Sequence, residues 1–213
     1  MGKDALIVFI KNPHRGKVKT RIAKTLGDDE ALRIYNYLLN YTLQMCEDTE
    51  MLCYLYFSET VNDDVRWHSK NFKHKIQKGQ DLGFRMGSAL HEVGREHNKV
   101  VIIGSDCPFI TPQIIYKAFA ALDSTPLCIG PSTDGGYYLL GINFESIGSK
   151  RIQNRQAWAL FENMEWSTET VLRETLERAQ ENNLAVTFLP HYFDIDTQSD
   201  WEKYLALQNK TVL

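Results

Sequence analysis

The chain has 213 residues, a length that suits one domain with a substantial core. Hydrophobic residues make up 43% of it and charged residues 24%, which is ordinary for a globular protein and excludes a disordered chain. The net charge of −3 gives no general reason to expect a nucleic acid or a membrane surface as a partner. No apolar stretch approaches the roughly 20 residues of a membrane-spanning helix, so we expect a cytoplasmic protein.

Apolar runs alternate with helical periodicity, beginning with the continuous apolar run Ala5–Ile10, which predicts a strand buried on both faces. Further strands are predicted at Met51–Phe57, Val100–Ile103, Leu127–Gly130, Tyr137–Ile142 and Ala185–Leu189. Helices are predicted from Asp28, as N-cap, to about Cys46, from Asp81 or Leu82 to about Glu96, over Pro112–Leu122, from Ser167 or Thr168 to about Asn182, and over Gln198–Leu207. This alternation predicts right-handed crossovers and a three-layer α/β/α sandwich, with one domain over residues 1–213.

A basic loop directly follows the first predicted strand. The stretch from Ala5 to Gly27 holds six Lys or Arg residues and no acidic residue. Polyphosphate needs several cations and free backbone N–H groups, which a loop leading into a helix supplies, so Lys11–Arg21 is a candidate phosphate site. It is not a P-loop, because the first glycine of that motif is absent. A solvated surface loop is the alternative, and the position after the first strand favours phosphate binding.

Aspartates lie just beyond two of the predicted strands. Asp106 follows the strand Val100–Ile103, and Asp194 and Asp196 follow the last strand. Ligands of α/β sheets bind outside the carboxyl ends of the strands, where carboxylates can hold Mg²⁺ or Mn²⁺ against substrate phosphates. The alternatives are local, because Asp106 could cap a turn and Asp196 could cap the final helix. Which of Asp194 and Asp196 would be the second metal ligand is left open.

Three further segments hold candidate substrate contacts: Arg85; Asp134, Gly135 and Gly136; and Trp166, Ser167 and Thr168. The arginine could reach a phosphate or pair with an acid. In the second segment the glycines would let the backbone approach a ligand that the aspartate binds, and an ordinary β-hairpin turn is the alternative. The third segment could contact an acceptor or cap the helix that follows it.

In their order along the chain, these motifs resemble the nucleotide-diphospho-sugar transferase superfamily, which has the glycosyltransferase A fold. Within it, the chain is most similar to a family of uncharacterised bacterial glycosyltransferase-like transferases. The matching segments are 9–13, 18–21, 81–83 with 85–86, 104–108, 130–131 with 134–138, 166–168 and 194–197. The basic loop also resembles 2-phospholactate guanylyltransferases, and the segment 194–197 is similar to molybdenum-cofactor nucleotidyltransferases.

The resemblance implies a mixed, mainly parallel sheet with nucleotide bound over the first strands. It implies that Lys11, Lys19 and Arg21 hold phosphates and act in catalysis. It also implies that Asp106 takes part in catalysis, and that Asp106 and Asp196 ligate Mg²⁺ or Mn²⁺. Two features depart from the superfamily pattern: the glycine-rich first loop is replaced by the basic loop, and a single aspartate replaces the Asp-x-Asp pair of the glycosyltransferases after the middle strand.

We therefore predict a metal-dependent transferase that acts on an activated nucleotide, by nucleotidyl transfer from a nucleoside triphosphate to a small phosphorylated acceptor. The alternatives are a glycosyltransferase with a nucleotide-diphospho-sugar donor, disfavoured by the missing Asp-x-Asp pair, and a non-catalytic nucleotide-binding module. The expected partners are a nucleotide or nucleotide-sugar and a small-molecule acceptor, without nucleic acid or membrane. If the basic loop serves only to bind phosphate, replacing Lys19 and Arg21 with Ala should leave the stability of the free protein nearly unchanged.

Overall fold

A single mixed sheet forms the centre of the molecule. The computed structural model describes residues 4–61, 64–147, 158–162 and 164–211. The strands are β1 Ala5–Ile10, β2 Leu52–Phe57, β3 Phe72–Ile76, β4 Lys99–Ile103, β5 Leu127–Pro131, β6 Tyr137–Asn143 and β7 Val186–Phe188. Their order is β3-β2-β1-β4-β6-β5-β7, and β6 runs antiparallel to both of its neighbours while the remaining pairs are parallel. The predicted mixed, mainly parallel sheet is confirmed.

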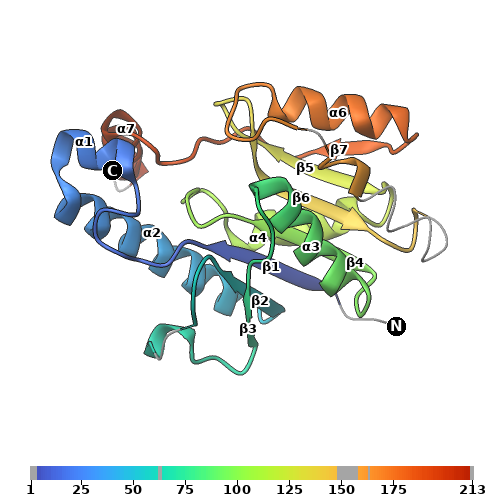
Figure 1. Cartoon of the computed structure of the whole chain (residues 1–213), viewed down its shortest axis with the longest axis horizontal. Helices are drawn as coiled ribbons and strands as arrows, with labels where there is room; N and C mark the ends of the chain where they lie inside the picture. The colour runs from blue at the N-terminus through green and yellow to red at the C-terminus, as the bar shows by residue number, and fades with distance from the viewer. Residues whose placement is uncertain (1–3, 62–63, 148–157, 163, 212–213) are drawn as a thin grey trace.

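Helices cover both faces of this sheet (Figure 1). They are α1 Thr20–Leu26, α2 Asp28–Asp48, α3 Leu82–Gly94, α4 Pro112–Ala121, α6 Val171–Glu181 and α7 Gln198–Thr211, with a short 3₁₀ turn at Val65–Trp67. Alternate side chains of β1 point to opposite faces, so Leu6 packs in one core with α2 and α4 while Ile7 packs in a second core with α3 and α6. The predicted three-layer sandwich is confirmed. Among the described residues no helix is long and apolar enough to cross a membrane.

A third apolar cluster joins α1, α2 and α7 beyond one end of the sheet (Figure 1). Ile22 of α1 and Ile34 of α2 pack there with Trp201 and Tyr204 of α7. The segment before α7 contributes the fully buried Ile195. This cluster fixes the basic loop before α1 and the Asp-Ile-Asp segment before α7 against each other, and both segments reach the candidate site.

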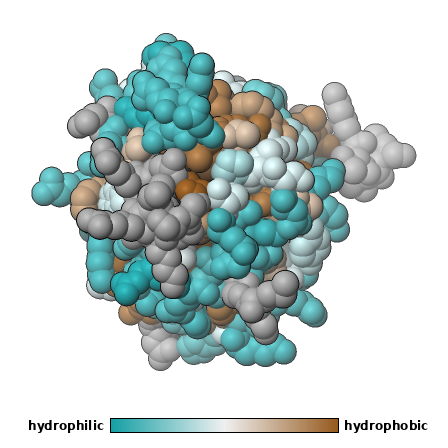
Figure 2. Space-filling model, turned by 90° about the vertical axis from the view of Figure 1, so that its right-hand side faces the viewer, coloured by the Kyte–Doolittle hydropathy of each residue, from teal (hydrophilic) through white to brown (hydrophobic). Residues whose placement is uncertain are grey.

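The remaining surface is mostly polar on the face that Figure 2 shows, where apolar side chains appear in separate small areas. Several large apolar side chains are exposed, among them Leu82 and Phe84 at the start of α3, which are 41% and 51% exposed. Leu82 also lines the candidate site.

Four elements differ from the sequence-based prediction. Helix α1 and strand β3 were not predicted, because α1 begins inside the basic loop and β3 carries two lysines at the edge of the sheet. Asp28 is the first residue of α2 rather than its cap, a position that Gly27 takes. The predicted helix from Ser167 or Thr168 begins only at Val171.

Candidate active site

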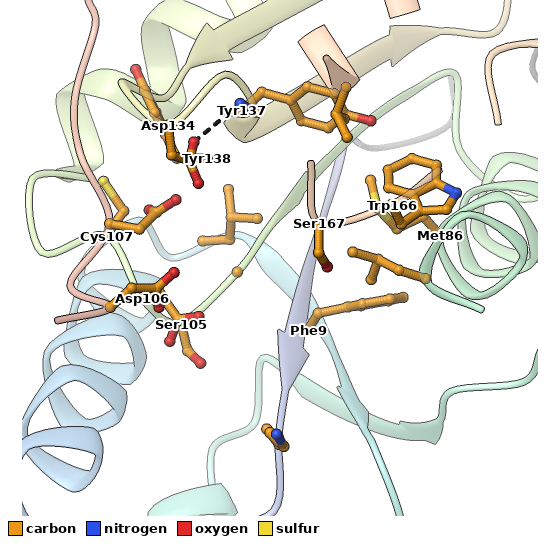
Figure 3. A pocket seen from close by; sticks show the side chains of 18 of the residues that line it. Phe9, Met86, Ser105, Asp106, Cys107, Asp134, Tyr137, Tyr138, Trp166 and Ser167 are labelled. Atoms are coloured by element: carbon orange, nitrogen blue, oxygen red, sulfur yellow. Dashed lines mark hydrogen bonds between the residues drawn. The ribbon is translucent and has the colours of Figure 1, made fainter. Parts of the chain in front are cut away.

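A cleft of about 890 Å³ opens at the carboxyl ends of the central strands. Its walls come from the ends of β1 and β4, the β5–β6 turn, the start of α3, and the segments before α6 and α7. In Figure 3, Asp106, Cys107 and Asp134 lie on one side of the cleft, while Phe9 and Trp166 lie on the other. The cleft therefore has a charged half and an apolar half, and its volume suits a nucleotide-sized ligand.

The backbone at the end of β1 is held by a buried tyrosine of α2. Tyr35 accepts a hydrogen bond from the Lys11 backbone N–H at 3.0 Å and donates its own to the Lys11 carbonyl at 2.6 Å. Its hydroxyl also lies 3.3 Å from the Ser105 hydroxyl, next to Asp106. Burial raises the pKa of Tyr35, so the phenol stays neutral. The Lys11 side chain is exposed on the cleft and has no ion-pair partner in the part of the chain that the structure describes.

Lys19 joins the two aspartates that were predicted to share a metal. Its Nζ lies 2.8 Å from Asp106 Oδ1 and 3.1 Å from Asp196 Oδ1, and its side chain is only 5% exposed. Burial disfavours the charge on Lys19, but the two carboxylates outweigh that effect and raise the pKa of Lys19 above its ordinary value. Arg21 is more distant, with Nη1 3.9 Å from Asp196 Oδ2 and a 67% exposed side chain.

These contacts qualify the expected effect of replacing the two cations. Arg21 is exposed, as a residue that serves only to bind ligand would be. Lys19 is buried between two carboxylates, so its replacement removes interactions that hold three segments of the fold together. The expectation that the free protein tolerates both replacements therefore does not extend to Lys19.

Other cations of the basic loop form ion pairs outside the cleft lining. Arg15 donates to Asp29 at 2.6 Å, and Lys17 pairs with Glu59 at 3.4 Å. The cations of the loop that line the cleft are Lys11, Lys19 and Arg21. The excess of basic residues in the sequence thus overstates the charge that a bound phosphate would meet.

A divalent metal fits the geometry of Asp106 and Asp196 in part. Two oxygens that contact one ammonium at 2.8 Å and 3.1 Å lie close enough to share a cation, given oxygen–metal distances of roughly 2.0–2.6 Å. Within the described ranges, no group of three or more His, Cys, Asp or Glu residues is arranged to hold a metal. The donors therefore match a Mg²⁺ or Mn²⁺ bound by one or two carboxylates and completed by phosphates and water.

Asp194 adds a third carboxylate behind this pair. Burial, reinforced by the negative charges of Asp106 and Asp134, raises the pKa of Asp194 to about 7. Its Oδ2 accepts a hydrogen bond from the Ser132 hydroxyl at 3.2 Å. The shift favours the protonated form of Asp194 in the free protein.

Neither Asp106 nor Asp196 acts as a helix cap, which was the alternative local role for these residues. The α7 N-terminus has a capping box in which Thr197 and Asp200 exchange backbone-to-side-chain hydrogen bonds of 2.8 Å and 3.3 Å. This leaves the Asp196 carboxylate free to contact Lys19. The Asp106 carbonyl accepts a hydrogen bond from the Ile195 N–H at 3.0 Å, which ties the end of β4 to the Asp-Ile-Asp segment.

The Asp134-Gly135-Gly136 segment is the turn between the antiparallel strands β5 and β6. Asp134 accepts a hydrogen bond from the Gly136 N–H at 3.0 Å, and Gly135 has a positive φ of 88°. The Gly135 carbonyl accepts from the Leu172 N–H at 2.8 Å, so the turn itself caps the start of α6. Asp134 and Gly136 line the cleft, whereas Gly135 does not, and its need for glycine comes from the fold.

The apolar half of the cleft is built around Trp166. A Cβ added to Gly83 of α3 would lie 2.3 Å from Trp166 Nε1, and the indole stacks on Phe161 at 6.1 Å. Ser167 has a positive φ of 66°, and the Thr168 hydroxyl donates to the Glu165 carbonyl at 2.9 Å rather than capping α6. All three residues of the segment line the cleft.

The cleft brings together nearly every residue singled out in the sequence. Arg85 lines it from α3 while its Nε donates to the Gly79 carbonyl at 3.1 Å, and it forms no ion pair in the described structure. Gly135 alone among the predicted residues is absent from the lining. Sequence reasoning missed Tyr35 and Gln77, which also line it. No local signal marks Tyr35, whose spacing is that of a core position, whereas Gln77 stands in a polar segment before α3.

Residues 42–168 match the family described as "Uncharacterized protein conserved in bacteria (DUF2064)". This match spans more than half of the chain. The chain belongs to this family. No curated protein matches the sequence.

Solved structures share the fold. A candidate nucleotide-diphospho-sugar transferase from Desulfovibrio desulfuricans G20 is 29% identical with a TM-score of 0.81, and the match covers 92% of this chain and 84% of that one. A 4-diphosphocytidyl-2C-methyl-D-erythritol synthase from Anaerococcus prevotii DSM 20548 is 13% identical, has a TM-score of 0.62 and covers 98% and 97%. Rv0371c from Mycobacterium tuberculosis H37Rv, solved in complex with manganese, is 12% identical, with a TM-score of 0.54 and coverage of 94% and 97%.

The resemblance to nucleotide-diphospho-sugar transferases is thus confirmed at the level of family and fold. The neighbours whose names state an activity are nucleotidyl transferases or nucleotide-diphospho-sugar transferases, and the chain is a transferase of this fold. One neighbour carries manganese, which concerns that protein and bears on this chain only as support for a proposal.

Proposed function

We propose that the protein transfers a nucleotidyl group from a nucleoside triphosphate to a small phosphorylated acceptor. The observation that carries the proposal is the convergence, in one cleft, of the exposed Lys11 with the Lys19–Asp106–Asp196 cluster. A triphosphate needs cations along its length, and its leaving pyrophosphate needs charge neutralised as it forms. The charged half of the cleft offers both.

In the proposed reaction, a phosphate oxygen of the acceptor bonds to the α-phosphorus of the nucleotide. The bond from that phosphorus to the bridging oxygen breaks, and its electron pair leaves with pyrophosphate. Lys11 and Arg21 bind the phosphates, and Arg85 approaches them from α3. Catalysis then consists of positioning and charge neutralisation, without a covalent enzyme intermediate. Burial raises the pKa of Cys107, which keeps this neighbouring thiol protonated and unsuited to act as a nucleophile.

A bound Mg²⁺ or Mn²⁺ would be held by Asp106 and Asp196, with Asp194 beside them, and would supply positive charge to the phosphates. Before a metal binds, Lys19 keeps Asp106 and Asp196 turned toward each other, since both contact its ammonium. Trp166, Ser167 and Thr168 lie where an acceptor could rest against the apolar half, and Asp134 and Gly136 where ligand hydroxyls could be bound.

Glycosyl transfer from a nucleotide-diphospho-sugar is a second candidate, because the 29% identical structure is described as a nucleotide-diphospho-sugar transferase. In that reaction the cations would neutralise a departing nucleoside diphosphate. The single Asp106 after β4, in place of an Asp-x-Asp pair, favours the nucleotidyl reaction. The two differ in which class of nucleotide binds.

A thermal-shift panel tests the proposal, with each nucleoside triphosphate and a set of nucleotide-sugars, with and without Mn²⁺. A ligand of the folded state adds about 2.7 kcal/mol at a hundredfold excess over its dissociation constant. Stabilisation by a triphosphate supports nucleotidyl transfer, and stabilisation by nucleotide-sugars alone supports glycosyl transfer. If no nucleotide raises the melting temperature under any condition, the proposal is wrong.

A matched pair of variants locates the effect. Lys11→Ala should abolish the nucleotide-dependent shift without changing the melting temperature of the free protein, because the side chain is exposed and forms no ion pair with any residue that the structure describes. Lys24→Ala removes an exposed cation of α1 that lies outside the cleft lining, so it should leave the shift intact. Equal losses in the two variants would argue against a role for Lys11.

A further inference from the structure

We propose that Lys19 makes the binding of a divalent cation depend on a polyphosphate already in the cleft. This inference rests on the metal and phosphate sites of the proposed function. It adds that the ammonium and the metal compete for one position, so Lys19 is a positioning residue that sets the order in which ligands bind.

The contacts of Lys19 place its charge where a shared cation would sit. Its Nζ lies 2.8 Å and 3.1 Å from one oxygen each of Asp106 and Asp196, the same two carboxylates proposed as metal ligands. The side chain is 5% exposed, so water screens its charge poorly. A second cation brought to these oxygens would meet a buried positive charge within a few ångströms, and repulsion would weaken its binding.

The backbone of Lys19 is specialised as well. Its φ of 46° and ψ of 47° put it in the left-handed region just before α1. Residues other than glycine rarely adopt this conformation. Such a conformation persists where surrounding contacts maintain it, and here the Lys19 carbonyl accepts a hydrogen bond from the Ala23 N–H at 2.9 Å while the ammonium forms the two ion pairs. Replacement of these ion pairs by phosphate contacts would let the same side chain change partners.

A polyphosphate supplies that change of partner. Its oxygens carry several negative charges, and a lysine can turn from carboxylates to phosphates by rotating its flexible side chain. Once the ammonium pairs with phosphate, Asp106 and Asp196 lose the cation between them and their mutual repulsion favours a divalent ion. Metal binding then follows phosphate binding rather than preceding it.

Arg21 provides the matched comparison. It also approaches Asp196, but at 3.9 Å, and its side chain is 67% exposed. Its charge is screened by water and does not lie between the two carboxylates. Removing Arg21 should therefore leave the order of binding unchanged, whereas removing Lys19 should abolish it.

The test is calorimetric titration of Mn²⁺ into the full-length, metal-free protein, with inorganic tripolyphosphate as a phosphate probe that carries no base. We expect the wild-type protein to bind Mn²⁺ weakly alone, and Mn²⁺ with tripolyphosphate to raise its melting temperature more than the two separate effects combined. Lys19→Met should bind Mn²⁺ alone at least about tenfold more tightly than wild type. Arg21→Met should bind Mn²⁺ alone as weakly as the wild type does, although it should bind tripolyphosphate less tightly. Adding Asp106→Asn to Lys19→Met should remove the gained affinity, which assigns it to this site.

Equal Mn²⁺ affinity in the wild type and in Lys19→Met would overturn the inference. Lys19→Gln serves as a second variant if Lys19→Met does not fold. The wild-type protein provides a second test without any variant. Tight Mn²⁺ binding in the absence of tripolyphosphate would contradict competition between the metal and Lys19. Failure of the proposed function gives a different result: neither tripolyphosphate nor any nucleotide stabilises the protein, while the Mn²⁺ affinities of the variants still measure the competition.

Discussion

Replacing Gly135 with alanine tests whether the β5–β6 turn is a structural support of the site. The new Cβ would lie 2.1 Å from the Glu169 carbonyl oxygen and 2.6 Å from its Cα, and these are backbone atoms that cannot rotate away. The φ of 88° adds a left-handed conformation that costs alanine roughly 1–2 kcal/mol. Forcing the segment before α6 outward adds about 1–3 kcal/mol, as overpacking does in protein cores. We expect Gly135→Ala to lower the free energy of unfolding by about 3 kcal/mol.

The neighbouring glycine is the control. Gly136 lies outside the left-handed region, and a Cβ there would approach nothing closer than Asp134 Oδ1 at 3.4 Å. Gly136→Ala should therefore change the free energy of unfolding by less than about 1 kcal/mol. Urea denaturation of both variants, followed by circular dichroism, measures the two values. Equal losses would refute the argument from the Glu169 backbone, and a stable Gly135→Ala variant that fails to bind nucleotide would restore a direct ligand role for this residue.

Three further predictions concern the charged half of the cleft and α7. Lys19→Met should lower the free energy of unfolding, measured by urea titration, by about 2 kcal/mol. This value lies between those of surface and buried ion pairs, because Asp106 and Asp196 are 43% and 40% exposed. Arg21→Met should lower it by less than about 0.5 kcal/mol. Asp194 has a folded pKa of about 7 against an ordinary 3.8, so the folded state keeps a proton that the unfolded state releases, and stability falls as pH rises through this window. In EDTA, the free energy of unfolding of Asp194→Asn should fall less with pH than that of the wild type, and at pH 8 it should be higher by at most about 4 kcal/mol. A wild-type free energy of unfolding that stays constant or rises from pH 4 to pH 7 would contradict the raised pKa of Asp194. Thr197→Ala removes the capping box of α7 and should cost about 1 kcal/mol, with Thr197→Ser as the conservative variant that retains the stability; equal losses in thermal melts would mean that the hydroxyl does not cap.

The sequence is informative where one local interaction dominates. The run Ala5–Ile10 has no polar residue, so only a strand buried on both faces suits it, and β1 has these bounds. The helix at Pro112 and the cap at Asp81 follow equally local rules. Strand β3 escapes prediction because its lysines suit an exposed edge, and that edge exists only because β2 pairs with it.

The site shows the same division between local and distant causes. The positions of Asp106 and Asp196 beyond strand ends led to the expectation that they meet, since the strands share an edge. Thr168 was a reasonable cap by its spacing, but the Gly135 carbonyl of a distant turn accepts the hydrogen bond from Leu172 at the start of α6. The hydrogen bonds of Tyr35 to Lys11 and Ser105 span 24 and 70 residues, a separation that no pattern in one sequence reveals.

The ion pair between Lys19 and Asp196 joins residues 177 positions apart, which has a consequence for folding. Closing so long a loop costs more chain entropy than the local contacts of α2 or α3, so the pair should form late. During synthesis the N-terminal strands and helices can assemble first, but Lys19 receives its second carboxylate only when the segment before α7 leaves the ribosome. Until then its ammonium has Asp106 alone as a partner, and the cleft lacks the wall that α7 supports. The competence of this protein for its ligands therefore arises in the final step of folding rather than gradually.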